Sequence, residues 1–77
     1  MSLAVSSTTV NSSLLACVIY EAGELLLDLE FRNGAIYRYL DVPEVVHQAL
    51  LAAESKGNYF NHQIRNCFHC HCIRRSR

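Results

Sequence analysis

Cysteine and histidine crowd one short run near the C-terminal end of this 77-residue chain, Cys67-Phe68-His69-Cys70-His71-Cys72. Thiolate and imidazole are the ligands that Zn²⁺ prefers in proteins, and Cys67-x-x-Cys70 has the spacing of a zinc knuckle. The candidate metal ligands are Cys67, His69, Cys70 and Cys72. A second pair of such ligands is missing elsewhere, and four tetrahedral bonds from so short a run would strain the backbone. We therefore expect no cofactor and keep a zinc site as the alternative.

A second group of residues combines positive charge with aromatic rings and amides. Lys and Arg side chains neutralise phosphates, and exposed aromatic rings stack on unpaired bases. The candidate nucleic-acid-binding residues are Arg32, Tyr37, Arg38, Tyr39, Lys56, Asn58, Tyr59, Asn61, His62 and Arg65. The alternative interpretation places Tyr59 and Phe60 in the core and leaves the cations as a solvated face.

The charges of the chain are separated along the sequence. Lys and Arg balance Asp and Glu at seven each, so the formal net charge is zero. All seven acids precede residue 55, in company with Arg32 and Arg38, whereas residues 55–77 carry the other five cations and no acid. Such an asymmetry is a hint of contact with nucleic acid or an anionic surface.

The sequence predicts no enzyme. A chain of this length forms one small domain with a thin core, which argues against a large enclosed active site. No Ser/His/Asp set, glycine-rich phosphate loop or inward-facing carboxylate pair can be assembled from its residues. His47, three residues after Glu44 on an expected helix, is interpreted as exposed surface.

The N-terminal part of the chain lacks a complete targeting signal. Leu14-Leu15-Ala16-Cys17 resembles a lipoprotein cleavage site, but residues 1–13 contain no Lys or Arg and are rich in Ser and Thr. The apolar run at residues 14–20 is too short to span a bilayer, which needs about 20 residues. We expect a cytoplasmic protein without membrane contact, whose cysteines are mostly reduced.

Three segments in the first half of the chain have the pattern of strands. Residues 14–21 are rich in β-branched and aromatic side chains, and residues 24–32 alternate apolar and polar positions. Asn33-Gly34 is a strong hairpin signal that leads into a third strand at residues 35–40. The sequence thus predicts a three-stranded antiparallel meander.

The length of the hairpin loop decides which face carries two tyrosines. A two-residue loop at Asn33-Gly34 would place Tyr37 and Tyr39 on the polar face of the sheet. One further residue in the loop is expected to place Tyr37 opposite Phe31 and Tyr39 opposite Leu29, on the core face. We favour the longer loop, because it gives a thin core two large aromatic rings.

Two helices are predicted after the third strand. Asp41 and Glu44 fit a capping box, and the apolar residues from Glu44 to Glu54 recur at helical spacing. The expected buried face of this helix is Val45, Val46, Ala49, Leu50 and Ala53. Ser55 is expected to cap a second short helix. Its sheet-facing residues are predicted to be Tyr59, Phe60 and Ile64, and its outward residues Asn58, Asn61, His62 and Arg65.

The order of these motifs resembles the KTSC domain family. Asn-Ser-Ser before the first strand, Leu-x-Leu-x-Phe-x-x-Gly into Tyr37-x-Tyr39, Val42-Pro43, and Ala-x-Ser-Lys-Gly-x-Tyr-Phe-Asn-x-x-Ile at residues 53–64 carry the resemblance over residues 10–66. The family is a short module, bacterial and free-standing or at the C-terminus of some lysyl-tRNA synthetases. The resemblance implies a small α+β module with an RNA role. After Asn66 the Cys/His run departs from the family pattern, and Phe68 is expected to stand in for the family's aromatic residue.

We therefore expect an α+β domain at residues 14–66, in which the three-stranded antiparallel meander is followed by two short C-terminal helices packed on one face. Residues 1–13 are expected to form a flexible N-terminal segment and residues 67–77 a Cys/His-rich basic tail. The expected function is a non-catalytic binding module with transfer RNA or a structured RNA as its ligand. The alternatives are a protein-interaction or dimerisation module and a small metal-binding protein.

Overall fold

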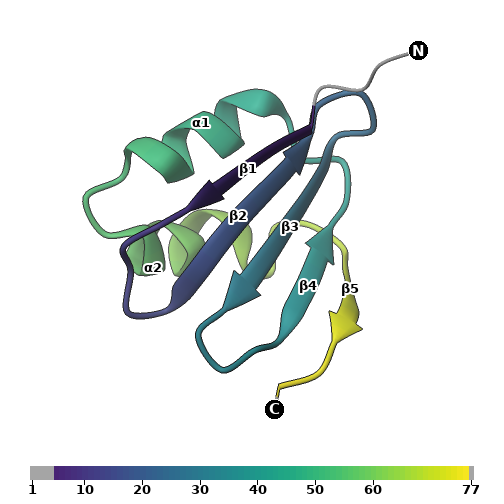
Figure 1. Cartoon of the computed structure of the whole chain (residues 1–77). Coiled ribbons are helices and arrows are strands. Elements are labelled where there is room, and N and C mark those ends of the chain that lie inside the picture. The colour runs from purple at the N-terminus through teal and green to yellow at the C-terminus, as the bar shows by residue number, and fades with distance from the viewer. Residues whose placement is uncertain (1–4, 77) are drawn as a thin grey trace.

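The structure is a computed structural model that describes residues 5–76. It contains a five-stranded antiparallel sheet with the strands side by side in the order β1-β2-β3-β4-β5 (Figure 1). The strands are β1 (Val5–Thr9), β2 (Leu15–Glu21), β3 (Leu26–Phe31), β4 (Ile36–Tyr39) and β5 (Cys70–Arg74). Three helical segments, α1 (Glu44–Ala52), α2 (Lys56–Tyr59) and the π-helical η1 (Phe60–Ile64), separate β4 from β5.

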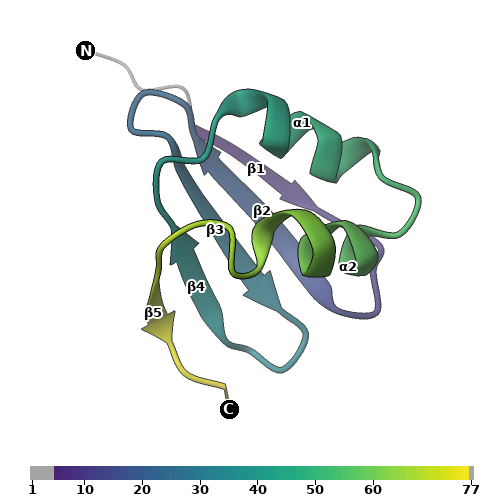
Figure 2. The ribbon, with the colours of Figure 1, turned by 180° about the vertical axis from the view of Figure 1, so that it is seen from behind.

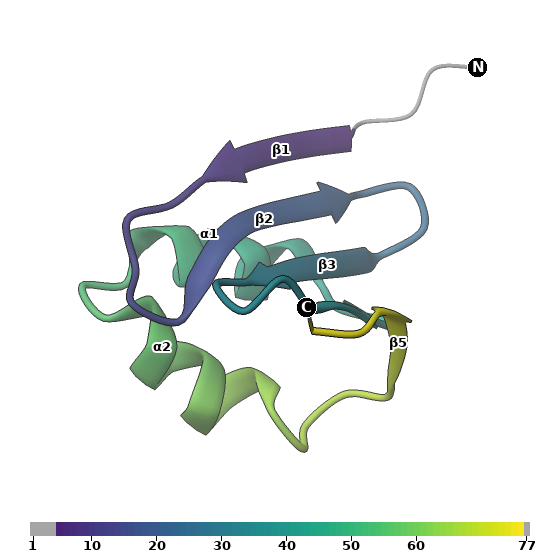
Figure 3. The same cartoon turned by 60° about the horizontal axis from the view of Figure 1, so that its bottom comes forward.

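The helices all lie on one face of the sheet. They are behind the strands in Figure 1 and in front of them in Figure 2, and Figure 3 shows the sheet and the helices as two layers. The opposite face carries no other element in the described part of the chain, and we call it the open face. The α+β class is thus confirmed, with one layer of helices packed on one layer of strands.

The predicted alternation of residues 24–32 is confirmed by the burial pattern of β3, and most of β2 alternates in the same way. Val18 and Tyr20 of β2 and Leu27 and Leu29 of β3 point to the helices and are at most 1% exposed. Leu15 is also fully buried, and a β-bulge between Leu15 and Cys17 interrupts the alternation of β2. Burial of such side chains is the main favourable term in folding. From the helical side the core is completed by Val42, Leu50, Phe60 and Ile64.

The β3–β4 hairpin has the three-residue loop that we favoured. Gly34 N–H donates to Phe31 O (2.9 Å), and Phe31 N–H donates to Ala35 O (2.8 Å). Gly34 has a φ of 95°, so the loop requires the left-handed conformation that glycine adopts most readily. Tyr37 and Tyr39 lie on the core face, as predicted.

The predicted cross-strand partners of these tyrosines are wrong by two residues. Tyr37 pairs with Leu29 rather than Phe31, and Tyr39 pairs with Leu27 rather than Leu29. The cause is the Phe31–Ala35 pair that closes the three-residue loop, because the register of a hairpin follows from the closing pair. A shift of two residues leaves every side chain on the same face, so the core-facing side chains of β4 were predicted correctly.

The prediction of a three-stranded meander is wrong because it missed both edge strands. β1 lies within residues 1–13 and pairs with β2 from Val5↔Glu21 to Thr9↔Cys17. β5 lies within residues 67–77 and pairs with β4. Neither strand has an apolar alternation, since β1 is mostly exposed Ser and Thr and four of the five residues in β5 are exposed. Their pairing is supplied by the backbone of the neighbouring strand.

The predicted capping box of α1 is wrong. The helix begins at Glu44 with Pro43 at its N-cap, and no side chain caps it. Asp41 instead has a φ of 58°, in the left-handed region. The chain is held there by Val42, whose side chain is fully buried and whose N–H donates to Leu25 O (2.9 Å). The helix therefore starts after the segment anchored in the core.

The buried face of α1 differs from the prediction by a small rotation. Val45 is 73% exposed, whereas His47, expected at the surface, is only 6% exposed. The His47 ring stacks on Tyr20, with ring centroids 4.4 Å apart and planes at 17°. Neither ring nitrogen has a hydrogen-bond partner among the described residues. Burial lowers the pKa of His47, an effect that nearby Glu44 partly opposes.

The second helical segment agrees with the prediction. Ser55 Oγ accepts a hydrogen bond from Asn58 N–H (3.2 Å) at the start of α2. Phe60 and Ile64 are buried, and Tyr59 is partly buried against the core. After η1 the chain leaves the helix layer and returns to the sheet as β5 (Figure 2).

Candidate nucleic-acid interface

A groove lies on the helix-covered side of the sheet, where η1 and the segment after it approach β4 and β5. It consists of two cavities that share Phe31 and Tyr37 in their linings. The first has a volume of about 480 Å³ and is lined by Phe31, Asn33, Ala35, Tyr37, Cys72, Arg75 and Ser76. The second has a volume of about 370 Å³ and is lined by Phe31, Tyr37, Tyr39, Phe60, Arg65, Asn66, Phe68 and Cys70. We call the two cavities together the aromatic groove.

The aromatic groove is lined by rings that pack against one another. Phe31 meets Tyr37 edge to face, with centroids 6.0 Å apart, and meets Phe60 in the same way at 5.3 Å. Phe60 also meets Tyr39 edge to face at 5.8 Å. Edge-to-face contacts of this kind are favourable because the positive ring edge meets the negative ring face. The rings therefore form a continuous wall of edge-to-face contacts.

Tyr39 forms the buried end of this wall. Its side chain is 5% exposed, and burial raises its pKa to about 12, with a smaller contribution from the neighbouring Cys70 thiol. The phenol is thus neutral at physiological pH. Tyr37 is only partly buried and borders both cavities, so it is the more accessible of the two rings.

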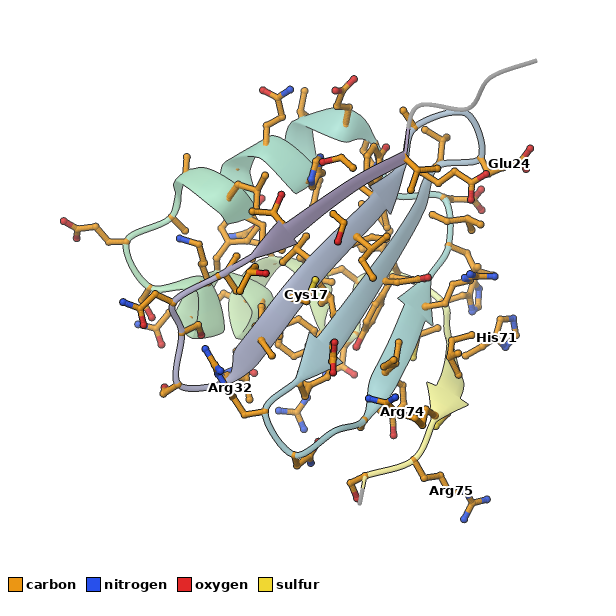
Figure 4. The ribbon with its side chains drawn as sticks, in the orientation of Figure 1. Cys17, Glu24, Arg32, His71, Arg74 and Arg75 are labelled. Carbon is orange, nitrogen blue, oxygen red and sulfur yellow. The ribbon has the colours of Figure 1, made fainter. Side chains whose placement is uncertain are left out.

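Each cavity has one arginine at its rim. Arg65 lines the second cavity and Arg75 the first. Arg75 points away from the body of the molecule beyond the end of β5 (Figure 4). Neither cavity lining contains Asp or Glu, in keeping with the acid-free sequence of residues 55–77. The groove therefore combines apolar rings with positive charge.

The structure places the predicted nucleic-acid residues on several surfaces. Tyr37, Tyr39 and Arg65 meet in the aromatic groove. Arg38 lies on the open face, where it forms a two-pronged ion pair with Asp28 at 2.9 and 3.0 Å. The proposed single surface of cations and aromatic rings is therefore wrong, because β4 directs its tyrosines and its arginine to opposite faces.

Two of the predicted cations have structural partners. Arg32 donates to the backbone oxygens of Ser12 (2.9 Å) and Val10 (3.0 Å), and it thereby holds the loop between β1 and β2. Figure 4 shows it at that end of the sheet. Lys56 Nζ donates to Ala53 O (3.0 Å), next to the end of α1.

The other predicted residues lie around the outer side of α2 and η1. Asn58, Asn61 and His62 are exposed there, and Asn58 O lies 2.8 Å from His62 Nδ1. Tyr59 is partly buried against the core, which supports the packing interpretation for that ring. Arg65 joins this outer surface to the groove, because its Nη1 donates to Asn61 Oδ1 (3.5 Å) while the residue also lines the second cavity.

The predicted metal ligands are not brought together. Within residues 5–76 no three His, Cys, Asp or Glu side chains gather in a group that could hold a metal ion. β5 is extended, so Cys70 and Cys72 lie on the groove side opposite Tyr39 and Tyr37, while His71 pairs with Arg38 on the open face. All three C-terminal cysteines are free and exposed. The chain turns at residues 65–68, but from Cys70 onward it is an extended strand and not a loop that could close around a metal ion.

Several groove residues were not identified as site residues from the sequence. Phe31 was assigned only to the core, and Asn66 was assigned to no site. Cys70 and Cys72 were named only as candidate metal ligands, and Arg75 was counted among the cations of the C-terminal segment. Their place beside the rings depends on the missed strand β5. The positive charge of the C-terminal segment was the available signal. Phe68, expected to replace a family aromatic residue, is partly buried against the core and lines the second cavity.

Fold and groove together define a small α+β module in which one sheet carries an open aromatic site at its edge. Residues 11–68 match the KTSC domain family, and the chain belongs to that family. A KTSC domain protein from Yersinia pestis has the same fold, with a TM-score of 0.86 and 36% identity over 91% of this chain and 99% of that structure. The resemblance found in the sequence is confirmed.

Relatives of two kinds share this module. An uncharacterized protein from Stutzerimonas stutzeri is 46% identical over 52 residues, which cover 68% of this chain and 73% of that protein. A lysine–tRNA ligase from Nostoc sp. is 41% identical over 58 residues, which cover 75% of this chain but only 10% of the ligase. In the described part of this chain no helix is long and apolar enough to cross a membrane.

Proposed function

We propose that this chain is a non-catalytic RNA-binding module that holds RNA in the aromatic groove. The observation that carries the proposal is the combination of rings and arginines in one groove without a carboxylate. Aromatic rings stack on bases, and arginine attracts phosphates. The relationship to a segment of a lysine–tRNA ligase makes transfer RNA the first ligand to test.

Binding is tested by fluorescence anisotropy with labelled transfer RNA at increasing salt. We expect the affinity to fall steeply with salt, because binding releases counterions from the phosphates. Arg65→Gln should weaken binding at all salt concentrations and reduce the salt slope by about one. A chain that binds no transfer RNA at low salt would contradict the proposal.

Arg38→Gln is the matched control for Arg65→Gln. It removes the same single positive charge, but from the open face, where Arg38 pairs with Asp28. Its affinity for transfer RNA should stay within about twofold of the unaltered chain, once circular dichroism shows that it folds, because it contacts no phosphate in the proposed complex. Equal weakening by both variants would show that charge alone, and not the groove, decides binding.

Light scattering of the free chain tests the competing role as a dimerisation module.

A further inference from the structure

The aromatic groove repeats the same chemistry in its two cavities. Each cavity has aromatic rings, one arginine and one cysteine, which are Arg75 and Cys72 in the first and Arg65 and Cys70 in the second. The shared wall is Tyr37 together with Phe31. The two cysteines are two residues apart on one side of β5, so the repeat distance along the strand is about 6.6 Å.

This repeat suits a ligand that is itself a chain of planar, negatively charged units. The rings offer faces for stacking, and an arginine lies beside each set of rings. Bases inside a duplex already stack on both faces, so they cannot enter the second cavity, which is lined by Cys70 of β5 and by Asn66 and Phe68, or stack on the rings of the first cavity. Unpaired bases can.

We propose that the aromatic groove binds at least two adjacent unpaired nucleotides of RNA, one base in each cavity, with Tyr37 between them. The inference rests on the proposed RNA-binding function and specifies its ligand as single-stranded rather than duplex RNA. In the complex, Arg65 contacts the phosphate of one nucleotide at the second cavity, and Arg75 turns from its outward position to contact the phosphate of the other at the first cavity. No bond is made or broken in this binding.

The cysteines provide the test, because one lies in each cavity and a third, Cys17, lies on the open face of β2 (Figure 4). The folded chain is alkylated with N-ethylmaleimide, and modification of each cysteine is followed by mass spectrometry. Three samples are compared: the free chain, the chain with a short single-stranded RNA, and the chain with the blunt duplex of the same RNA.

Single-stranded RNA should slow the alkylation of both Cys70 and Cys72 and leave Cys17 unchanged. The duplex should bind about tenfold more weakly or worse and protect neither groove cysteine, since stacking of each base contributes about that factor. Equal protection by the duplex, or protection of only one groove cysteine, would overturn the inference. RNA binding without protection would overturn it while leaving RNA binding itself intact. Absence of any RNA binding would overturn the proposed function as well.

Tyr37→Leu tests the dividing ring, and Tyr59→Leu is its control because Tyr59 is a partly buried tyrosine outside both linings. Tyr37→Leu should lower the affinity for single-stranded RNA about tenfold and remove the preference over duplex. Tyr59→Leu should retain both. The reverse result would overturn the inference, and the cysteine measurement on the unaltered chain decides the matter if either variant fails to fold.

Discussion

Two tyrosines on the same face of one sheet have opposite surroundings. Tyr20 on β2 is 1% exposed, its ring stacks on His47, and its hydroxyl donates to Val42 O beneath α1. Tyr37 on β4 is only partly covered and borders both cavities of the aromatic groove. The alternation of a strand determines which face of the sheet a side chain is on. The helices above that face determine whether the side chain is packed in the core or is accessible to a ligand. We use the name covered half for α1 and the part of the sheet beneath it, which together contain Tyr20, His47 and Leu50.

Loss of the covered tyrosine should have the largest effect on stability. Tyr20→Ala removes a fully buried ring together with its hydrogen bond, and we expect a loss of about 3–5 kcal/mol in the free energy of unfolding. Urea denaturation followed by circular dichroism measures it. Tyr37→Ala should cost clearly less, and equal losses would contradict the contrast between the two regions.

The buried histidine should make the covered half sensitive to acid. The pKa of His47 is lowered in the folded chain by burial, so the unfolded chain binds the proton first as the pH falls. Above the pKa of an unfolded histidine, about 6.5, His47 is neutral in both states and the free energy of unfolding is unaffected. As the pH falls from there toward the lower pKa of the folded state, protonation of the unfolded chain reduces the free energy of unfolding. Glu44 is the acid that opposes the shift, and the facing Tyr20 stays neutral because burial raises its pKa.

His47→Leu is expected to remove this acid sensitivity. It should also raise the stability near neutral pH by about 1 kcal/mol, because it removes two buried nitrogens that lack partners. Urea midpoints of both chains at neutral and mildly acidic pH provide the measurement. If the two chains lose stability in parallel, His47 is not the source of the acid sensitivity.

Weakening the attachment of the edge strand β5 should reduce the free energy of unfolding less than the loss of Tyr20 does, and its effect should be confined to β5. Arg74 Nε donates to Gly34 O (2.8 Å), and Arg74 Nη2 lies 3.2 Å from Glu30 Oε2. Both groups are partly exposed, so Arg74→Gln should cost about 1 kcal/mol. Hydrogen exchange should accelerate in β5 and stay unchanged in β2. Unchanged exchange in β5 would show that backbone pairing alone holds this strand.

The aromatic groove itself should contribute little to the stability of the fold. Tyr37→Leu keeps an apolar side chain at a partly exposed position and should change the free energy of unfolding by less than about 1.5 kcal/mol. The same variant should bind single-stranded RNA about tenfold more weakly. A large loss of stability in urea denaturation would assign Tyr37 to the core instead of to a binding surface.

The central strands and α2 could be predicted because local patterns determine them. Leu27 and Leu29 alternate with acids in β3, and Ser55 caps α2 through its own backbone neighbours. α1 was located correctly, but its buried face was assigned from apolar residues alone. A neutral histidine can replace an apolar residue when a ring such as Tyr20 covers it, and the composition of the helix does not reveal that partner.

The groove was only partly predictable. Tyr37, Tyr39 and Arg65 were selected for charge and aromatic character, and they do meet. Arg38 was grouped with them although its neighbours on the strand point to the opposite face. Cys70 and Cys72 were named as candidate metal ligands of an alternative zinc site because of their residue type and spacing. The strand β5 that carries them was missed because it has no apolar alternation. Its pairing with β4 depends on residues more than thirty positions away in the sequence.

The most direct test of RNA binding at the aromatic groove is a titration of the ¹⁵N-labelled chain with a short single-stranded RNA, followed by NMR. The account predicts that amide signals shift in residues 31–39 and 65–76, while those of α1 and of Cys17 and Ile19 on the open face stay in place. Shifts centred on α1 or on the open face, or no shifts at all, would contradict it.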